Sequence, residues 1–270
     1  MKRKHFTAII AIIIIIFGAS LLSSGFQGTE RIDIVGSTSV QPAAEKLAEE
    51  YGNINPHVKI NVQGGGSSVG IKTANMGIAD IGMSSRHLEE SERDGLKEYE
   101  IGRDGIVLAT NINNNVSDLT KDQLKDIYSG KILNWKEVGG KDSPINVVIR
   151  EAGSGTLNAF EHIVMDGEDI RSDAIVQSST EAVKQSVKQD ENAIGFVSFA
   201  HMSSDVNTLK IKGVAPESES IADGSYELQR PFIFIVNENA TEEVEKFIDW
   251  TRGREAQGIL ESEKVIKSSN

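Results

Sequence analysis

At 270 residues the chain is long enough to bury a large core and to divide into two lobes. Its 28 Lys and Arg against 40 Asp and Glu give a formal net charge of −12, which argues against a nucleic-acid-binding protein because that function needs a basic face. The chain has no Cys, which excludes disulfides, thiolate metal sites and a lipid-modified N-terminal Cys.

The N-terminus has the pattern of a targeting segment. Basic residues 2–4 precede an apolar run over 6–22, and small or polar residues follow at 23–25. This order is typical of a secretory signal, and the apolar run also approaches the length of a membrane span. Residues 1–28 are therefore predicted to be a cleaved signal peptide or a retained N-terminal membrane anchor. In both cases the basic flank places the rest of the chain outside the cytoplasm.

From Arg31 onward, apolar extended segments alternate with segments of helical periodicity. Strands are expected at 31–35, 58–62, 79–83, 105–109, 145–149, 174–176, 193–199, 209–211 and 232–236. Helices are expected at 43–51, 69–76, 87–97, 120–128, 157–164, 179–189 and 242–262. Strands that alternate with helices throughout predict an α/β protein with largely parallel sheets.

Three polar turns, each between an expected strand and an expected helix, share one composition. They are Ser37-Thr38-Ser39, Gly66-Ser67-Ser68 and Gly153-Ser154-Gly155-Thr156. In open α/β sheets such turns gather at the carboxyl ends of the strands, where ligands bind. A single turn of this kind is usually a helix cap, and Thr38 or Ser39 fits the cap of the helix that follows. Three such turns with many hydroxyl donors instead favour an anion-binding site.

The third turn directly follows a cation. Arg150 directly follows the apolar strand expected at 145–149, and its planar guanidinium matches the geometry of an oxyanion. The glycines on both sides of Ser154 let the backbone approach a ligand, and the helix that follows begins with unpaired N–H groups at the positive end of its dipole. These parts together predict a site for a desolvated tetrahedral oxyanion.

Other kinds of site fit the sequence less well. The third turn lacks the Gly-Lys-Ser/Thr of a P-loop, and none of the turns has the Gly-x-Gly-x-x-Gly fingerprint of a dinucleotide site. There is also no His-x-x-x-His pair or clustered carboxylate loop that would indicate a metal site. However, residues 66–70 match the Gly-x-Ser-x-Gly pattern of a hydrolase nucleophile, with histidines downstream. A serine hydrolase that uses Ser68 is therefore one open alternative.

Four segments, taken together and in this order, resemble the PstS family, the phosphate-binding components of ABC phosphate importers. The segments are Gly36–Pro42, Gln63–Gly70, Ala79–Arg86 and Arg150–Thr156. The resemblance extends over essentially all of the chain after the targeting segment. It implies a type II periplasmic-binding-protein fold with two lobes and a ligand cleft between them. Lobe I would combine residues 31–107 with 229–270, and lobe II would be residues 108–228.

The resemblance also implies the function. The protein would capture inorganic phosphate outside the cytoplasm, in the periplasm or at the outer face of the cell membrane, and deliver it to the membrane permease of an ABC importer. It would act as a monomer, with no catalytic step, no cofactor, no metal and no nucleic-acid partner. The residues expected to bind phosphate are Thr38, Ser39, Ser67, Ser85, Arg86, Arg150, Ser154, Gly155 and Thr156.

The chain departs from the longer form of this family at two positions, Ser85 and Ala152, where that form has Asp. The first Asp accepts a hydrogen bond from protonated phosphate and so rejects sulfate. Ser85 can accept a hydrogen bond, but it can also donate one. Glu151 could take the acceptor role or could only orient Arg150. A binder of another tetrahedral oxyanion, such as sulfate or molybdate, is therefore a second open alternative.

Overall fold

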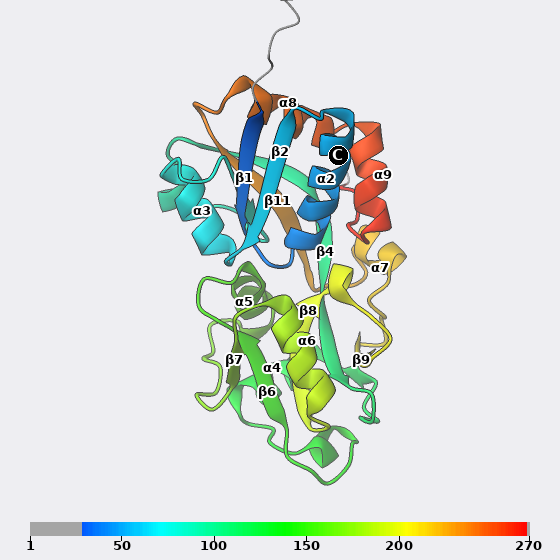
Figure 1. The fold of residues 1–270 in the computed structure, drawn as a ribbon. Coiled ribbons are helices and arrows are strands. Elements are labelled where there is room, and N and C mark those ends of the chain that lie inside the picture. Colours follow the sequence, from blue (N-terminus) through cyan, green and yellow to red (C-terminus); the bar gives the residue numbers. More distant parts are fainter. Residues whose placement is uncertain (1–28, 269–270) are drawn as a thin grey trace, which may run out of the picture.

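The computed structural model describes residues 29–268, so the predicted targeting segment lies outside the described residues. The described chain folds into two α/β lobes, lobe I above lobe II in Figure 1. No helix within residues 29–268 is both long and apolar enough to cross a membrane.

The elements follow in an alternating order. The strands are β1 (Glu30–Gly36), β2 (Val58–Gly64), β3 (Ile81–Ser84), β4 (Leu96–Asn111), β5 (Asp118–Leu119), β6 (Asn146–Arg150), β7 (Ile175–Gln177), β8 (Ala193–Ser198), β9 (Val206–Thr208), β10 (Lys210–Ile211) and β11 (Gln229–Asn237). The helices are α2 (Gln41–Ile54), α3 (Ser67–Asn75), α4 (Lys121–Ser129), α5 (Gly155–Phe160), α6 (Thr180–Gln189), α7 (Ser218–Ala222), α8 (Glu242–Thr251) and α9 (Arg254–Ser262). Short 3₁₀ turns lie at Glu90–Glu92, Trp135–Val138 and Phe199–His201, and a π-helical turn at Glu161–Met165.

The main sheet is mixed, with the strand order β2-β1-β3-β11-β4-β8-β6-β7 and β9 paired to β4. Strand β1 runs parallel to β2 and β3 in lobe I, and β6 runs parallel to β7 and β8 in lobe II. Every antiparallel pair of strands within residues 29–268 involves β4 or β11. The outer strands of each lobe are therefore parallel, as expected for largely parallel sheets, and the antiparallel pairs all involve the two strands that join the lobes.

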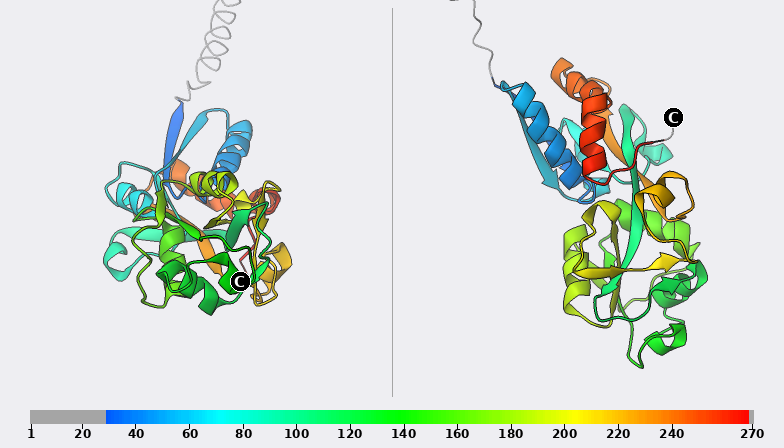
Figure 2. Two further views of the ribbon diagram at one scale, coloured as in Figure 1. Left: turned by 90° about the horizontal axis from the view of Figure 1, so that it is seen from below. Right: turned by 90° about the vertical axis from the view of Figure 1, so that its right-hand side faces the viewer.

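Strand β4 runs through both lobes, as the right-hand view of Figure 2 shows. Its first part pairs with β11, and its last part, from Ile106 on, pairs with β8. The hydrophobic core changes along it, because Ile101 packs in the core of lobe I and Ile106 in that of lobe II. The same change occurs between Leu228 and Phe232 at the start of β11. The two strands thus connect the lobes.

Helices cover both faces of the lobe I sheet, and this explains the run of consecutive apolar residues in β11. Alternate side chains of a strand face opposite sides of its sheet. Phe232 and Phe234 pack with residues of α2, α8 and α9, whereas Ile233 and Ile235 pack with residues of α3. A strand buried on both faces carries apolar residues at consecutive positions, as β11 does.

Two helix predictions are wrong because each range contains a glycine at a break. Within 87–97 only a single 3₁₀ turn forms, because Gly95 adopts the left-handed backbone conformation and β4 begins at the next residue. The range 242–262 contains two helices, α8 and α9, with Gly253 between them in an extended conformation. The helix predicted at 120–128 is confirmed, with Thr120 as its N-cap.

Candidate functional site

The three polar turns meet at the junction between the lobes. Two of them follow β1 and β2 of lobe I and the third follows β6 of lobe II, and the segments after β3 and β7 join them, so all lie at the carboxyl ends of parallel strands. Their side chains form one buried set, which we call the hydroxyl cluster. Its members, each at most 3% exposed, are Ser37, Ser39, Ser67, Ser85, Ser154, Thr156 and Thr180.

Hydroxyl groups in this cluster join the two lobes directly. Ser39 Oγ lies 3.1 Å from Thr156 Oγ1 and 2.9 Å from Thr180 Oγ1. Thr38 Oγ1 accepts a hydrogen bond from the backbone N–H of Thr180 at 3.3 Å. The prediction that Thr38 or Ser39 caps the next helix is wrong, because the N-cap of α2 is Val40 and has no side-chain cap bond. Both hydroxyl groups face lobe II instead.

Arg150 lies at one end of this hydroxyl network and is 2% exposed. Its Nε and Nη2 donate to the two carboxylate oxygens of Glu151 at 2.9 and 2.8 Å. Its Nη1 donates to Thr180 Oγ1 at 3.1 Å. Glu151 therefore orients the guanidinium through a bidentate pair and leaves Nη1 directed at the hydroxyl cluster.

A second buried cation, Arg230 of β11, lies at the other end of the network and was not predicted from the sequence. Its Nε and Nη2 donate to Asp104 Oδ2 at 3.0 and 2.9 Å. Its Nη1 donates to Ser85 Oγ at 3.2 Å and to Thr156 Oγ1. Asp104 is fully buried in β4. Asp104 directly precedes the buried apolar run of β4, and this position is the one signal that could have pointed to the pair, because unpaired Asp is almost never buried.

Arg86 is not brought together with the other predicted ligand residues. Its Nη1 and Nη2 donate to the carboxylate of Glu92 at 2.7 and 2.9 Å. Hydrogen bonding to Glu92 raises the pKa of Arg86, and hydrogen bonding to Arg86 lowers the pKa of Glu92. An ion pair outside the hydroxyl cluster therefore accounts for the burial of Arg86 without a ligand.

Ser68, the candidate hydrolase nucleophile, faces a cation. Its Oγ accepts a hydrogen bond from Arg86 Nη2 at 3.4 Å, and a guanidinium is not a general base. Gly70, the last residue of the hydrolase-like pattern, is required by packing. A β-carbon there would lie 2.6 Å from the carbonyl oxygen of Met83 and 2.7 Å from that of Val35. Close packing of α3 on β1 and β3 therefore explains the glycine, and the pattern requires no catalysis.

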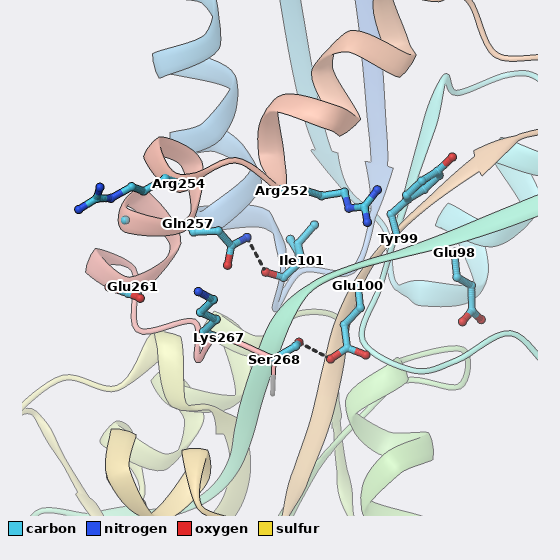
Figure 3. A pocket seen from close by; sticks show the side chains of 11 residues that line it. Glu98, Tyr99, Glu100, Ile101, Arg252, Arg254, Gln257, Glu261, Lys267 and Ser268 are labelled. Atoms are coloured by element: carbon cyan, nitrogen blue, oxygen red, sulfur yellow. Dashed lines mark hydrogen bonds between the residues drawn. The ribbon is translucent and has the colours of Figure 1, made fainter. Parts of the chain in front are cut away.

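Two cavities lie near the described elements but outside the hydroxyl cluster. A groove of about 940 Å³ in lobe I runs between β4, α9 and the C-terminal segment, and Figure 3 shows Gln257 reaching across it to the carbonyl of Ile101. The charges of its lining side chains cancel, so the groove does not favour an anion. The basic residues are Arg252, Arg254 and Lys267, and the acidic residues are Glu98, Glu100 and Glu261. A smaller cavity of about 340 Å³ spans the lobes, between Thr38 and Glu181.

Comparisons with known proteins identify the family of the chain. Residues 24–255 match the family model of a PBP superfamily domain. The phosphate-binding protein PstS of Bacillus subtilis is 34% identical over 230 residues, which cover 84% of this chain and 76% of the relative. The chain belongs to the PstS family. A second PstS, from Staphylococcus aureus, is 32% identical over 305 residues, and the alignment covers 99% of this chain and 91% of that protein.

Solved structures of phosphate-transport proteins have a fold similar to that of this chain. A Clostridium perfringens protein assigned as the substrate-binding protein of a phosphate ABC transporter, solved with bound phosphate, is 44% identical with a TM-score of 0.87. That match covers 89% of this chain and 100% of the other. An ABC-type phosphate transport receptor from Vibrio cholerae is 36% identical with a TM-score of 0.74, covering 88% and 100% of the two chains. The predicted PstS resemblance and the periplasmic-binding-protein fold are therefore confirmed.

Proposed function

We propose that this PstS-family protein captures inorganic phosphate at the junction between its lobes, as the substrate-binding protein of an ABC phosphate importer. The observation that carries the proposal is the buried hydroxyl cluster, to which both lobes contribute and which ends in the oriented guanidinium of Arg150. Many neutral donors and a cation in a site closed to water suit a desolvated tetrahedral oxyanion. The phosphate-binding proteins to which the chain is similar support phosphate as that oxyanion.

The proposed ligand residues differ from the sequence prediction at two positions. Thr180 is added because its Oγ1 lies between Arg150 and Ser39. Arg86 is left out because Glu92 already holds its guanidinium. The remaining ligand residues are those predicted: Thr38, Ser39, Ser67 and Ser85 from lobe I, and Arg150, Ser154, Gly155 and Thr156 from lobe II.

We further propose that the two lobes close on phosphate as units. Residues 31–107 with 229–270 would form lobe I, and residues 108–228 lobe II, so that β4 and β11 carry the hinge. Phosphate would favour the closed form because it bonds donors from both lobes at once. The closed monomer would then deliver phosphate to the membrane permease. Residues 1–28 would direct the protein out of the cytoplasm, either as a secreted protein or anchored at the outer face of the membrane.

Calorimetry of the protein against phosphate, sulfate, arsenate and molybdate tests this function. We expect tight 1:1 binding of phosphate. If molybdate or sulfate bound more tightly than phosphate, that oxyanion would be the proposed ligand instead of phosphate. Failure to bind any of the four, combined with hydrolysis of a simple ester that Ser68→Ala abolishes, would favour the hydrolase instead.

A further inference from the structure

The bonds of Arg230 extend beyond its ion pair with Asp104 into the hydroxyl cluster. Asp104 occupies its Nε and Nη2, and that pair already ties β4 to β11. The remaining nitrogen, Nη1, donates to Ser85 of lobe I and Thr156 of lobe II, both of them proposed phosphate ligands. The guanidinium therefore reaches the hydroxyl cluster from a position where it contacts both lobes.

Asp104 is saturated by its own partners, so it holds Arg230 without reaching into the cluster itself. Its Oδ2 accepts both bonds from Arg230, and its Oδ1 accepts a bond from Ser198 Oγ at 2.8 Å. Glu151 also holds Arg150 through Nε and Nη2, but with both of its carboxylate oxygens, whereas Asp104 uses Oδ2 alone. The two cations are thus matched in construction: each is fixed by one carboxylate and presents one nitrogen to the hydroxyl network.

Charge in this buried region favours an anion between the two guanidinium groups. Burial lowers the pKa of Arg230, Asp104 raises it, and the Arg150 cation lowers it again, so the two cations repel each other. Arg side chains nevertheless stay protonated in proteins. An oxyanion that contacts both cations relieves this repulsion, and a doubly charged oxyanion relieves it more than a singly charged one.

We infer that Arg230, held by Asp104, is a second cationic ligand of the bound oxyanion and gives the site a preference for dianions over monoanions. The inference rests on the proposed function, because it assigns a further residue to the same phosphate site. A purely structural role requires only that buried Nη1 be hydrogen-bonded, whereas both of its partners are proposed phosphate ligands, one from each lobe.

The test removes the ion pair as a unit. Removal of Arg230 alone would leave the Asp104 charge buried and unpaired, whereas apolar residues in place of both partners often preserve stability. The variant is therefore Asp104→Leu with Arg230→Met, and the matched control is Arg171→Met with Asp173→Leu, a bidentate pair of lobe II. Phosphate affinity is measured by calorimetry at pH 8.0 and pH 5.5, and folding by thermal unfolding.

We expect the Asp104/Arg230 variant to bind phosphate at least about tenfold more weakly than the wild type at pH 8.0, where the dianion predominates. The loss should be smaller at pH 5.5, and the control variant should bind as the wild type does. Wild-type affinity in the folded variant would overturn the inference, and an equal loss at both pH values would overturn the preference for dianions. A wild type that does not bind phosphate would instead refute the proposed function.

If the double variant does not fold, Arg230→Lys decides the question. Lysine keeps the charge beside Asp104 but has a single nitrogen, so it lacks the planar fork with which Arg230 bonds Asp104 through Nε and Nη2 and reaches the cluster through Nη1. We expect phosphate affinity to fall at least about tenfold in this variant as well. Unchanged affinity in folded Arg230→Lys would overturn the inference.

Discussion

A β-carbon on Gly155 of lobe II would overlap the hydroxyl oxygen of Ser67 of lobe I. It would also lie 2.5 Å from Ser85 Oγ. Gly155 is the first residue of α5 and does not adopt the left-handed backbone conformation, so its own helix would accept a side chain. The glycine is therefore required by the approach of the other lobe.

This contact predicts that Gly155→Ala separates binding from folding. The added methyl group should hold the lobes apart and weaken phosphate binding at least about tenfold, because the cross-lobe contacts are lost. The melting temperature should change little. Calorimetry and thermal unfolding measure the two effects. Gly258→Ala in α9, where a β-carbon would meet no atom within 4 Å, is the control and should bind phosphate normally. Normal affinity in Gly155→Ala would contradict this account of closure.

Arg150→Ala tests the cation that the sequence predicted. Loss of its charge-assisted contact should weaken phosphate binding by at least ~1.5–3 kcal/mol. Glu151 would lose its partner, but its side chain is 30% exposed and can be hydrated. Calorimetry measures the change, with Arg171→Ala as the control for loss of a lobe II arginine. If phosphate affinity did not change, Arg150 would have to leave the ligand set.

The sequence was sufficient for the parts of the site that local patterns encode. Each polar turn follows an apolar strand and precedes a helix, so the turns around Ser39, Ser67 and Thr156 could be placed at one edge of the sheet before the structure was known. The order of these turns also indicated the family. Local patterns were sufficient because each turn is built by residues next to one another in the chain.

The parts that could not be predicted depend on contacts between distant residues. Arg230 and Asp104 come from different strands, and only the order β11-β4 in the sheet brings them together. Arg86 follows Ser85 directly, yet the carboxylate of Glu92 decides where its guanidinium lies. Which of two neighbouring polar residues faces a ligand is set by such partners, and composition does not show them.

His201 predicts that stability falls in mildly acidic solution. Its Nε2 is buried with no hydrogen-bond partner among the described residues. Burial lowers the pKa of His201 below its ordinary value of 6.5, against the opposing charges of Asp104 and Glu181; Lys184 lowers it further. Below pH 6.5 the unfolded chain therefore binds a proton that the folded protein does not, and the free energy of unfolding decreases as pH falls.

Urea unfolding of the wild type and His201→Gln at pH 7.5 and pH 5.5 measures this effect. The free energy of unfolding should fall more between the two pH values in the wild type than in the variant, because glutamine does not titrate. An equal fall in both proteins would show that His201 does not carry the pH dependence.

The hydrogen bond between Tyr51 and Glu243 in lobe I should contribute to the free energy of unfolding and not to phosphate binding. The hydroxyl of Tyr51 in α2 donates to Glu243 Oε1 in α8 at 2.9 Å, and Glu243 is buried. Tyr51→Phe should lower the free energy of unfolding by about 1.5–3 kcal/mol, as expected for loss of a hydrogen bond to a charged group. Urea unfolding measures the loss, and Tyr99→Phe, at the lobe I groove, is the control. A loss of phosphate affinity in Tyr51→Phe would mean that this contact also affects the site.

Ser85 predicts weak discrimination against sulfate. Its Oγ accepts hydrogen bonds from Ser37 Oγ at 3.1 Å and from Arg230 Nη1 at 3.2 Å, so both lone pairs are occupied, and its proton can be donated only to Ser67 Oγ, 3.3 Å away, or to an anion. Ser85 can then donate to an anion but cannot accept the proton of phosphate, and sulfate is not rejected at this position. We expect sulfate to compete with phosphate in calorimetric titrations of the wild type.

Ser85→Asp should restore the discrimination. A carboxylate at this position can accept the phosphate proton and repels sulfate, which has none, so the ratio of phosphate to sulfate affinity should rise at least about tenfold. Ser85→Ala removes the hydroxyl without adding an acceptor and should leave sulfate competing. If the wild type already excludes sulfate, another group in the cluster accepts the proton of phosphate. The site is then selective although it has Ser85 where the longer form of the family has Asp.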